Sequence, residues 1–217
     1  MINSALFFNK FLGSSSTSTL PKIILLMGGP GSGKGVLAKQ LSKANHFSIG
    51  ESLRTIINNP KHPKAQLFKE RIEQGKLLND QEVIDVMNQA DAFKQTKPIL
   101  LDGFPRTLTQ WHLFKNHYGS PAAVIDLSVS KDIMRSRLLS RGRKDDKVEV
   151  INYRIEDYFN NTRPMANKIL SESKNTLRIN ASTLNPKEIA EIAKKFLESK
   201  HIYPLDNQSK ELTSIHP

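Results

Sequence analysis

Residues 28–35 read Gly-Gly-Pro-Gly-Ser-Gly-Lys-Gly and follow directly on five apolar residues, which predict a buried strand. The spacing from Gly28 to Lys34 fits G-x-x-x-x-G-K, a loop whose backbone N–H groups surround phosphate oxygens while the lysine adds a positive charge. Gly35 stands where Ser or Thr usually binds magnesium, so a metal ion here needs another anchor. The alternative is a glycine-rich turn after a core strand. The combination of strand, loop and lysine favours a phosphate site.

Asp102 is a second group able to take part in chemistry, because it ends the short apolar run of residues 99–101. In open parallel sheets, ligands bind at the carboxyl ends of the strands, so Asp102 is the candidate for the missing magnesium anchor. We expect the contact to run through water, since magnesium keeps much of its hydration shell. The alternative is an ordinary Asp-Gly turn.

Several arginines stand at the ends of motifs or predicted elements, where side chains can converge. They are Arg54, Arg106, Arg141, Arg143 and Arg154. A guanidinium group matches phosphate with a planar pair of donors, so this number of arginines indicates two phosphorylated ligands rather than one triphosphate. An acceptor phosphate is already largely ionised near neutral pH, and its phosphorylation needs positioning and charge neutralisation rather than a catalytic base. None of the six histidines stands out as catalytic.

Composition limits the classes of protein and partner. The chain has 217 residues, no cysteine and a net charge of +11. The length predicts one domain, the charge favours anionic partners such as a polyphosphate, and the lack of cysteine excludes disulfides and thiolate zinc sites. No apolar run is long enough for a membrane span. The basic run at residues 135–144 could also suggest nucleic acid, but there are few aromatic residues to stack on bases, so we expect no nucleic-acid partner.

Apolar runs alternate with helical patterns over about 180 residues, which predicts an α/β fold with a parallel sheet covered by helices on both faces. Strands are predicted at residues 23–27, 47–49, 98–101, 123–127 and 177–179. Helices are predicted at residues 36–44, 51–58, 64–74, 80–90, 107–115, 131–140, 147–170 with a break near Pro164, and 186–198. The strandless segment between residues 51 and 78 indicates an insertion beside the sheet. The strand order stays open.

The two ends of the chain have different compositions from the centre. Residues 1–21 contain no acidic residue and include a Ser/Thr run at 14–19, so we expect a flexible extension; an organelle address is the alternative. Residues 22–200 would form the domain, and residues 201–217 a loose tail. We expect a cytoplasmic monomer.

From residue 22 to residue 197, which is most of the chain, the sequence resembles the adenylate kinases and their nucleoside monophosphate kinase relatives. The resemblance rests on the phosphate loop at 28–35, on Ser-Ile-Gly-Glu-Ser-Leu-Arg at 48–54, on Gly-Lys-Leu-Leu at 75–78, on Asp-Gly-Phe-Pro-Arg-Thr-Leu-Thr-Gln at 102–110, and on the arginines and Asp-Asp pair between Arg141 and Arg154. It implies a P-loop transferase of nucleotide biosynthesis that uses ATP, a nucleoside monophosphate and Mg²⁺. It also implies an acceptor-binding insertion at residues 49–78 and a short lid at residues 141–146.

The resemblance also implies roles for individual residues. The ATP-binding residues would be Gly31, Ser32, Gly33, Lys34, Gly35, Val36 and Arg141. The acceptor-binding residues would be Ile49, Arg54, Lys76, Leu77, Leu78, Gly103, Phe104, Pro105, Arg106, Gln110, Arg143 and Arg154. Lys34, Arg106, Arg143 and Arg154 would be catalytic, and Asp102 would hold hydrated magnesium.

Three departures from the family pattern keep alternatives open. Ile49 replaces a threonine beside the acceptor base, where UMP-CMP kinases have alanine, so a UMP or CMP kinase is the closest alternative to an adenylate kinase. Val36 replaces a threonine of the loop, and the lid is shorter than usual. These changes also allow a nucleotide-binding protein without turnover.

Overall fold

The computed structural model describes residues 21–203, apart from residues 75, 77, 89–92, 94–96 and 144. The extension expected at residues 1–21 and the tail expected at 201–217 lie almost wholly outside the described residues. The strands are β1 (Ile23–Gly28), β2 (Asn45–Ser48), β3 (Ile99–Asp102), β4 (Ala123–Ser128) and β5 (Thr176–Asn180). The helices are α2 (Lys34–Gln40), α3 (Ile49–Ile57), α4 (Ala65–Glu73), α5 (Asp80–Asn88), α6 (Leu108–Tyr118), α7 (Lys131–Arg141), α8 (Val148–Asp157), π-helical η2 (Tyr158–Thr162), α9 (Arg163–Glu172) and α10 (Pro186–Ser199).

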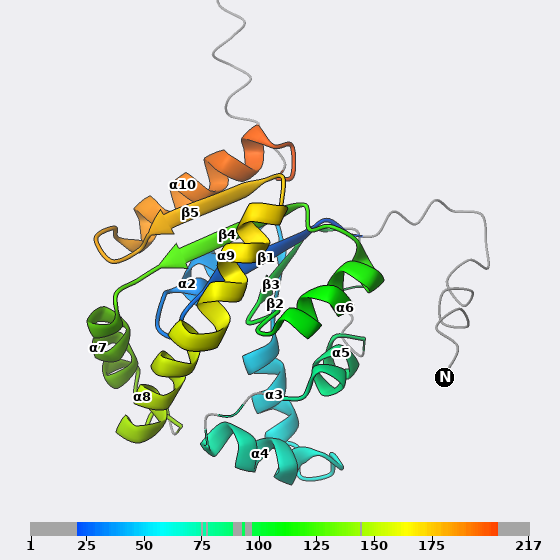
Figure 1. The fold of residues 1–217 in the computed structure, drawn as a ribbon, viewed down its shortest axis with the longest axis vertical. Coiled ribbons are helices and arrows are strands. Elements are labelled where there is room, and N and C mark those ends of the chain that lie inside the picture. The colour runs from blue at the N-terminus through cyan, green and yellow to red at the C-terminus, as the bar shows by residue number, and fades with distance from the viewer. Residues whose placement is uncertain are drawn as a thin grey trace, which may run out of the picture.

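The strands form one parallel sheet in the order β2-β3-β1-β4-β5, which confirms the predicted α/β class (Figure 1). The strand that leads into the phosphate loop, β1, is therefore the central one. Each neighbouring strand carries an aspartate near its carboxyl end: Asp102 of β3 is in register with Leu26, and Asp126 of β4 is in register with Met27.

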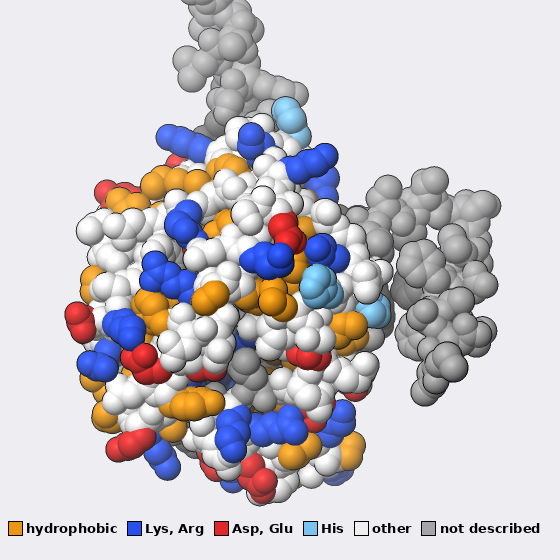
Figure 2. All heavy atoms as spheres, in the orientation of Figure 1, with side chains coloured by type: hydrophobic (Ala, Val, Ile, Leu, Met, Phe, Trp, Pro, Cys, Tyr) orange, Lys and Arg blue, Asp and Glu red, His pale blue; other side chains and the backbone are white. Residues whose placement is uncertain are grey.

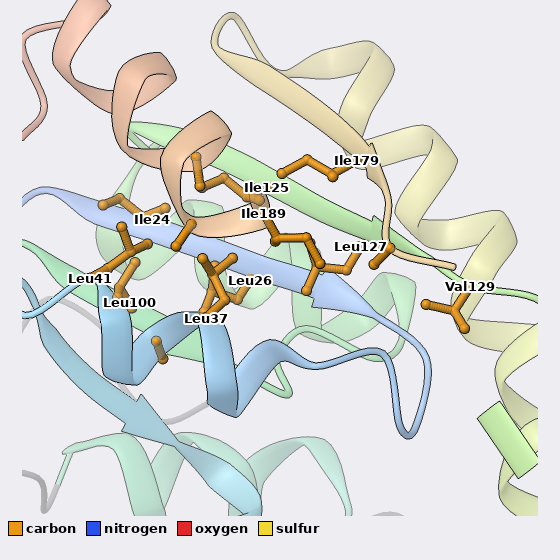
Figure 3. Packing of buried hydrophobic residues seen from close by; sticks show 14 of the residues in the cluster. Ile24, Leu26, Leu37, Leu41, Leu100, Ile125, Leu127, Val129, Ile179 and Ile189 are labelled. Atoms are coloured by element: carbon orange, nitrogen blue, oxygen red, sulfur yellow. The ribbon is translucent and has the colours of Figure 1, made fainter. Parts of the chain in front are cut away.

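Two apolar layers cover the sheet, because the strands are apolar on both faces, as expected of a parallel sheet. On one face, Ile24, Leu26 and Ile125 pack with Leu37 of α2 and Ile189 of α10 (Figure 3). On the other face, side chains from α5, α6 and α9 pack against the odd-numbered residues of β1. Trp111 and Phe114 of α6 belong to this second layer, as their spacing predicts.

One sequence prediction about local structure needs correction. Ile49 was assigned to a strand, but the strand ends at Ser48, whose side chain accepts the N–H of Glu51 and so caps α3. The predicted break near Pro164 is confirmed as the π-helical turn η2, where Arg163 N–H donates to the carbonyl of Tyr158. Proline has no N–H for an α-helical bond, so the turn before it is open to such a rearrangement.

The described chain enters and leaves at the amino edge of the sheet, opposite the phosphate loop. Lys22 Nζ donates to the carbonyl of His201 at 2.7 Å, and the N–H of Lys43 donates to the hydroxyl of Tyr203 at 2.7 Å. Within the described part of the chain, no helix is long and apolar enough to cross a membrane. On the face drawn in Figure 2, Lys and Arg side chains are interspersed with Asp and Glu.

Candidate active site

A cavity of about 660 Å³ opens at the carboxyl edge of the sheet, where β1 and β3 end. It is lined by nearly every residue that the sequence singled out: Gly31, Ser32, Gly33, Lys34, Gly35, Val36, Ile49, Arg54, Lys76, Leu78, Asp102, Gly103, Phe104, Pro105, Arg106, Gln110, Arg141, Arg143 and Arg154. Leu77 lies outside the described residues. The segments that carry the resemblance therefore meet around one space, although they are spread over more than a hundred residues.

The phosphate loop has the backbone that its glycines allow. Gly28 has a φ of 135°, and a Cβ there would lie 2.7 Å from the carbonyl oxygen of Leu127, so no larger residue fits. Lys34 follows the loop as the first residue of α2, and its Nζ donates to the carbonyls of Gly28 and Gly29 at 2.8 and 2.9 Å. The ammonium group thus lies over the loop, where the phosphates of a nucleotide would be bound.

Opposite charges face each other at the base of the cavity. Burial lowers the pKa of Lys34, and Arg106 lowers it further, whereas Asp102 and Asp126 raise it. Burial would raise the pKa of Asp102, but the bond with His46, 3.4 Å away, and the charges of Lys34 and Arg106 outweigh it, so this pKa lies below its ordinary value. Asp102 is therefore a buried, ionised carboxylate beside the phosphate loop, which suits a divalent cation.

The loop after β3 is held by its own side chains. The N–H of Arg106 donates to Oε1 of the buried Gln110 at 2.7 Å, and Arg106 Nε donates to the carbonyl of Gly103 at 3.0 Å. Oε1 keeps one further lone pair, and the amide NH₂ group can donate, so both ends of the Gln110 side chain are able to contact a ligand. The Arg106 guanidinium lines the cavity but is surrounded by protein atoms. The resulting loss of hydration lowers the pKa of Arg106, although the negative charge of the nearby Asp102 raises it. As a guanidinium it stays charged.

The short connection between α7 and α8 places its two aspartates among the arginines. Asp146 binds Arg141 through two bonds of 2.6 and 2.9 Å, and Asp145 binds Arg154 at 2.8 Å. Arg54 of α3 also approaches Asp145, at 3.7 Å. Asp145 thus links Arg154 of α8 to Arg54 of α3, which lies in the segment predicted to be an insertion beside the sheet.

Sequence reasoning missed several lining residues. Arg137 of α7 and Leu184, Pro186 and Ile189 around the start of α10 line the same cavity as Arg141. Asp157, Tyr158 and Thr162 line it from α8 and η2. The only available signal was the helical spacing of Arg137 and Arg141, one turn apart, because the rest come from segments that carry no motif.

The family model described as adenylate kinase matches residues 26–174, which include the phosphate loop, the loop after β3 and the Asp-Asp pair. The chain belongs to the adenylate kinase family. Curated relatives agree with this assignment. The adenylate kinase of Bacteroides thetaiotaomicron is 35% identical over 163 residues, which are 70% of this chain and 86% of the relative.

Other adenylate kinases are similar to comparable extents. That of Prochlorococcus marinus is 36% identical over 153 residues, which are 67% of this chain and 83% of the relative. Adenylate kinase isoenzyme 1 of Sus scrofa is 33% identical over 153 residues, which are 66% of this chain and 78% of the relative.

As a member of the adenylate kinase family, the chain is an enzyme, a nucleoside monophosphate kinase. Adenylate kinases in general use ATP with Mg²⁺. The residues fit such an ion, since Asp102 supplies an ionised carboxylate next to the phosphate loop. Among the described residues, no group of three or more His, Cys, Asp or Glu side chains could hold a metal ion. A magnesium ion would therefore take most of its ligands from phosphate and water.

Proposed function

We propose that this chain catalyses the reversible, magnesium-dependent transfer of the γ-phosphoryl group of ATP to AMP, giving two ADP. One observation carries the proposal: a single cavity is lined both by the phosphate loop and by Arg54, Arg106 and Gln110. Two phosphorylated ligands in one cavity can meet phosphate to phosphate. The relatives that bear the name adenylate kinase support the choice of substrates.

ATP would occupy the half of the cavity around the phosphate loop. Its phosphates would be held by Gly31, Ser32, Gly33, Lys34, Gly35 and Val36, with Arg141 on the same side. The base would lie between Arg137 and the apolar side chains of Leu184 and Ile189, because a guanidinium plane stacks well on an aromatic ring. Asp102 would hold hydrated Mg²⁺, which supplies positive charge to the phosphates when bound.

AMP would occupy the other half, with its phosphate on Arg54 and Arg106. Its base would contact the NH₂ group of Gln110, a donor that matches a ring nitrogen with a free lone pair, such as those of adenine. The remaining contacts would come from Ile49, Lys76, Leu77, Leu78, Gly103, Phe104 and Pro105.

The transfer itself would depend on charge neutralisation. Lys34, Arg106, Arg143 and Arg154 would stabilise the charge on the transferring group and hold the two phosphates in line. The acceptor phosphate is ionised, so no base takes part. Closure of the insertion at residues 49–78 and of the lid at residues 141–146 would exclude water, which would otherwise hydrolyse ATP.

A UMP or CMP kinase is the second candidate, favoured by Ile49. This residue is buried and lines the cavity, so a hydrocarbon stands where a hydroxyl would offer a hydrogen bond to the base. The NH₂ group of Gln110 can donate to ring N3 of cytosine or to a carbonyl oxygen of uracil, so it is compatible with both bases.

The test is ADP formation from ATP and Mg²⁺ with AMP, UMP, CMP or GMP, and with no acceptor. Turnover with AMP well above the others supports the proposal, and preference for CMP or UMP replaces it with the second candidate. Ile49→Thr, measured with the same acceptors, shows whether this position sets the preference. ATP binding without ADP formation from any acceptor would indicate a nucleotide-binding protein without turnover.

A further inference from the structure

The side chains of Asp80 and Thr107 join two segments of the acceptor half of the cavity. Thr107 Oγ1 donates to Asp80 Oδ1 at 3.0 Å in a partly buried position. Asp80 is the first residue of α5, and Thr107 is the N-cap of α6. Neither residue lines the cavity, but Leu78 and Val83 on one segment and Arg106 and Gln110 on the other do. The bond therefore lies directly behind the proposed acceptor site.

The bond to Asp80 fixes how the Thr107 hydroxyl is used. A hydroxyl has one hydrogen and can accept through two lone pairs. The hydrogen goes to Asp80, which directs a lone pair of the oxygen to the N–H of Gln110 at 3.1 Å. Gln110 in turn accepts the N–H of Arg106. Asp80 is thus linked through Thr107 to the backbone of Gln110, whose side chain in turn holds the backbone N–H of Arg106. These are the two residues proposed to hold the acceptor's base and phosphate.

Asp80 is itself held in place. Its neighbour Asn79 accepts the N–H of Glu82 through Oδ1 at 2.8 Å, and Glu82 Oε2 accepts the N–H of Asn79 at 2.9 Å, a reciprocal cap of α5. The carboxylate of Glu82 also forms an ion pair with Arg71 of α4. The start of α5 is therefore a fixed point from which Asp80 can orient Thr107.

We propose that Asp80 is a positioning residue for the acceptor nucleotide, acting through Thr107 on Gln110 and Arg106. The inference rests on the proposed function in one respect, that this half of the cavity binds the acceptor. If Asp80 only stabilised α5, its loss would lower the fraction of folded protein and would weaken the binding of AMP and ATP equally. A positioning residue lowers the affinity for the acceptor and leaves ATP binding unchanged.

The experiment compares Asp80→Ala with Asp85→Ala by calorimetry with AMP and, separately, with ATP. Asp85 is the matched control, because it lies on the same helix and pairs with Lys64 at 3.6 Å, away from the cavity. We expect Asp80→Ala to bind AMP about tenfold more weakly, the effect of losing a hydrogen bond to a charged group, while ATP binding stays within about twofold. Asp85→Ala should bind both nucleotides as the wild type does. Unchanged AMP affinity in Asp80→Ala, or an equal loss for ATP, overturns the proposal.

Thr107 provides an independent arm should Asp80→Ala fail to fold. Thr107→Ser keeps the hydroxyl and should retain most of the AMP affinity, whereas Thr107→Val should lose it. The double variant of Asp80→Ala with Thr107→Val should bind AMP no more weakly than Thr107→Val alone, because both changes remove the same bond. If the losses of AMP affinity in the two single variants instead multiply in the double variant, the proposal is contradicted. A wild-type chain that phosphorylates no monophosphate contradicts the proposed function instead, and the binding comparison with AMP still decides the role of Asp80.

Discussion

The carboxylate of Asp145 lies 2.8 Å from Nη2 of Arg154. Arg54 approaches the same carboxylate, so an internal anion neutralises two of the arginines proposed to bind phosphate. Burial would raise the pKa of Asp145, but its hydrogen bond with Arg154 and the charges of Arg154 and Arg54 outweigh it and hold this pKa below its ordinary value. We therefore expect a phosphate that binds these arginines to compete with an ionised carboxylate.

Asp145→Asn should bind AMP more tightly than the wild type in the absence of ATP. The expected gain is about twofold to fivefold, the usual strength of an accessible ion pair that no longer competes. Calorimetry measures it, with Asp132→Asn on the exposed start of α7 as the control. Equal or weaker binding would show that Asp145 supports the arginines in their binding positions rather than competing with phosphate.

Arg106→Ala should lower kcat/KM by about 10²-fold or more, because the variant loses a fixed positive charge beside the transferring group. Steady-state ADP formation measures the loss. Arg135→Ala is the matched control, since Arg135 is exposed and donates to Asn152 outside the cavity. A near-normal rate for Arg106→Ala would contradict the role proposed for it.

Asp102→Asn should shift the magnesium dependence of the reaction to higher concentrations, by about tenfold or more, the usual effect of losing a group that holds a metal's ligands. A magnesium titration of the rate measures this shift. ATP binding without magnesium should change much less, because the phosphate loop and Lys34 remain. An unchanged titration would remove Asp102 from the metal site.

Glu172 should contribute stability that depends on pH. Its carboxylate accepts from Lys168, from Nε1 of Trp111 at 2.9 Å and from Lys115, which lowers its pKa from 4.5 to about 2. Because the folded-state pKa is lowered, this contribution is complete above about pH 4.5 and is lost as the pH falls to about 2.

Glu172→Gln provides the measurement. Its Tm should lie below that of the wild type above pH 4.5, and the difference should shrink as the pH falls towards 2. Added salt should reduce the difference, since the group is exposed. A Tm difference that did not vary with pH would show that the charge of Glu172 is irrelevant.

Features with strong local signals could be predicted from the sequence. Apolar strands, the glycines before Lys34 and the Asp-Gly after β3 each depend on a few neighbouring residues, so the fold class and part of the cavity's lining could be predicted. The family resemblance supplied the lid and the acceptor residues. Their roles stay predictions.

Features that depend on tertiary contacts could not be predicted. Arg137 and Leu184 lie far apart in the sequence and line the cavity together only because α7 and the start of α10 flank the same edge of the sheet. The strand assignment of Ile49 was wrong because its apolar side chain suits a strand equally well, whereas the Ser48 cap starts a helix there. The bond between Asp80 and Thr107 likewise joins residues whose local patterns indicate only helix starts.

The bonds of Lys22 with His201 and of Lys43 with Tyr203 have a practical consequence. They hold residues near both ends of the described chain at the amino edge of the sheet, whereas the cavity opens at the carboxyl edge. A surface that contacts the amino edge would therefore face the back of the molecule. Enzyme immobilised through that edge should exchange nucleotides with the surrounding solution as freely as enzyme in bulk.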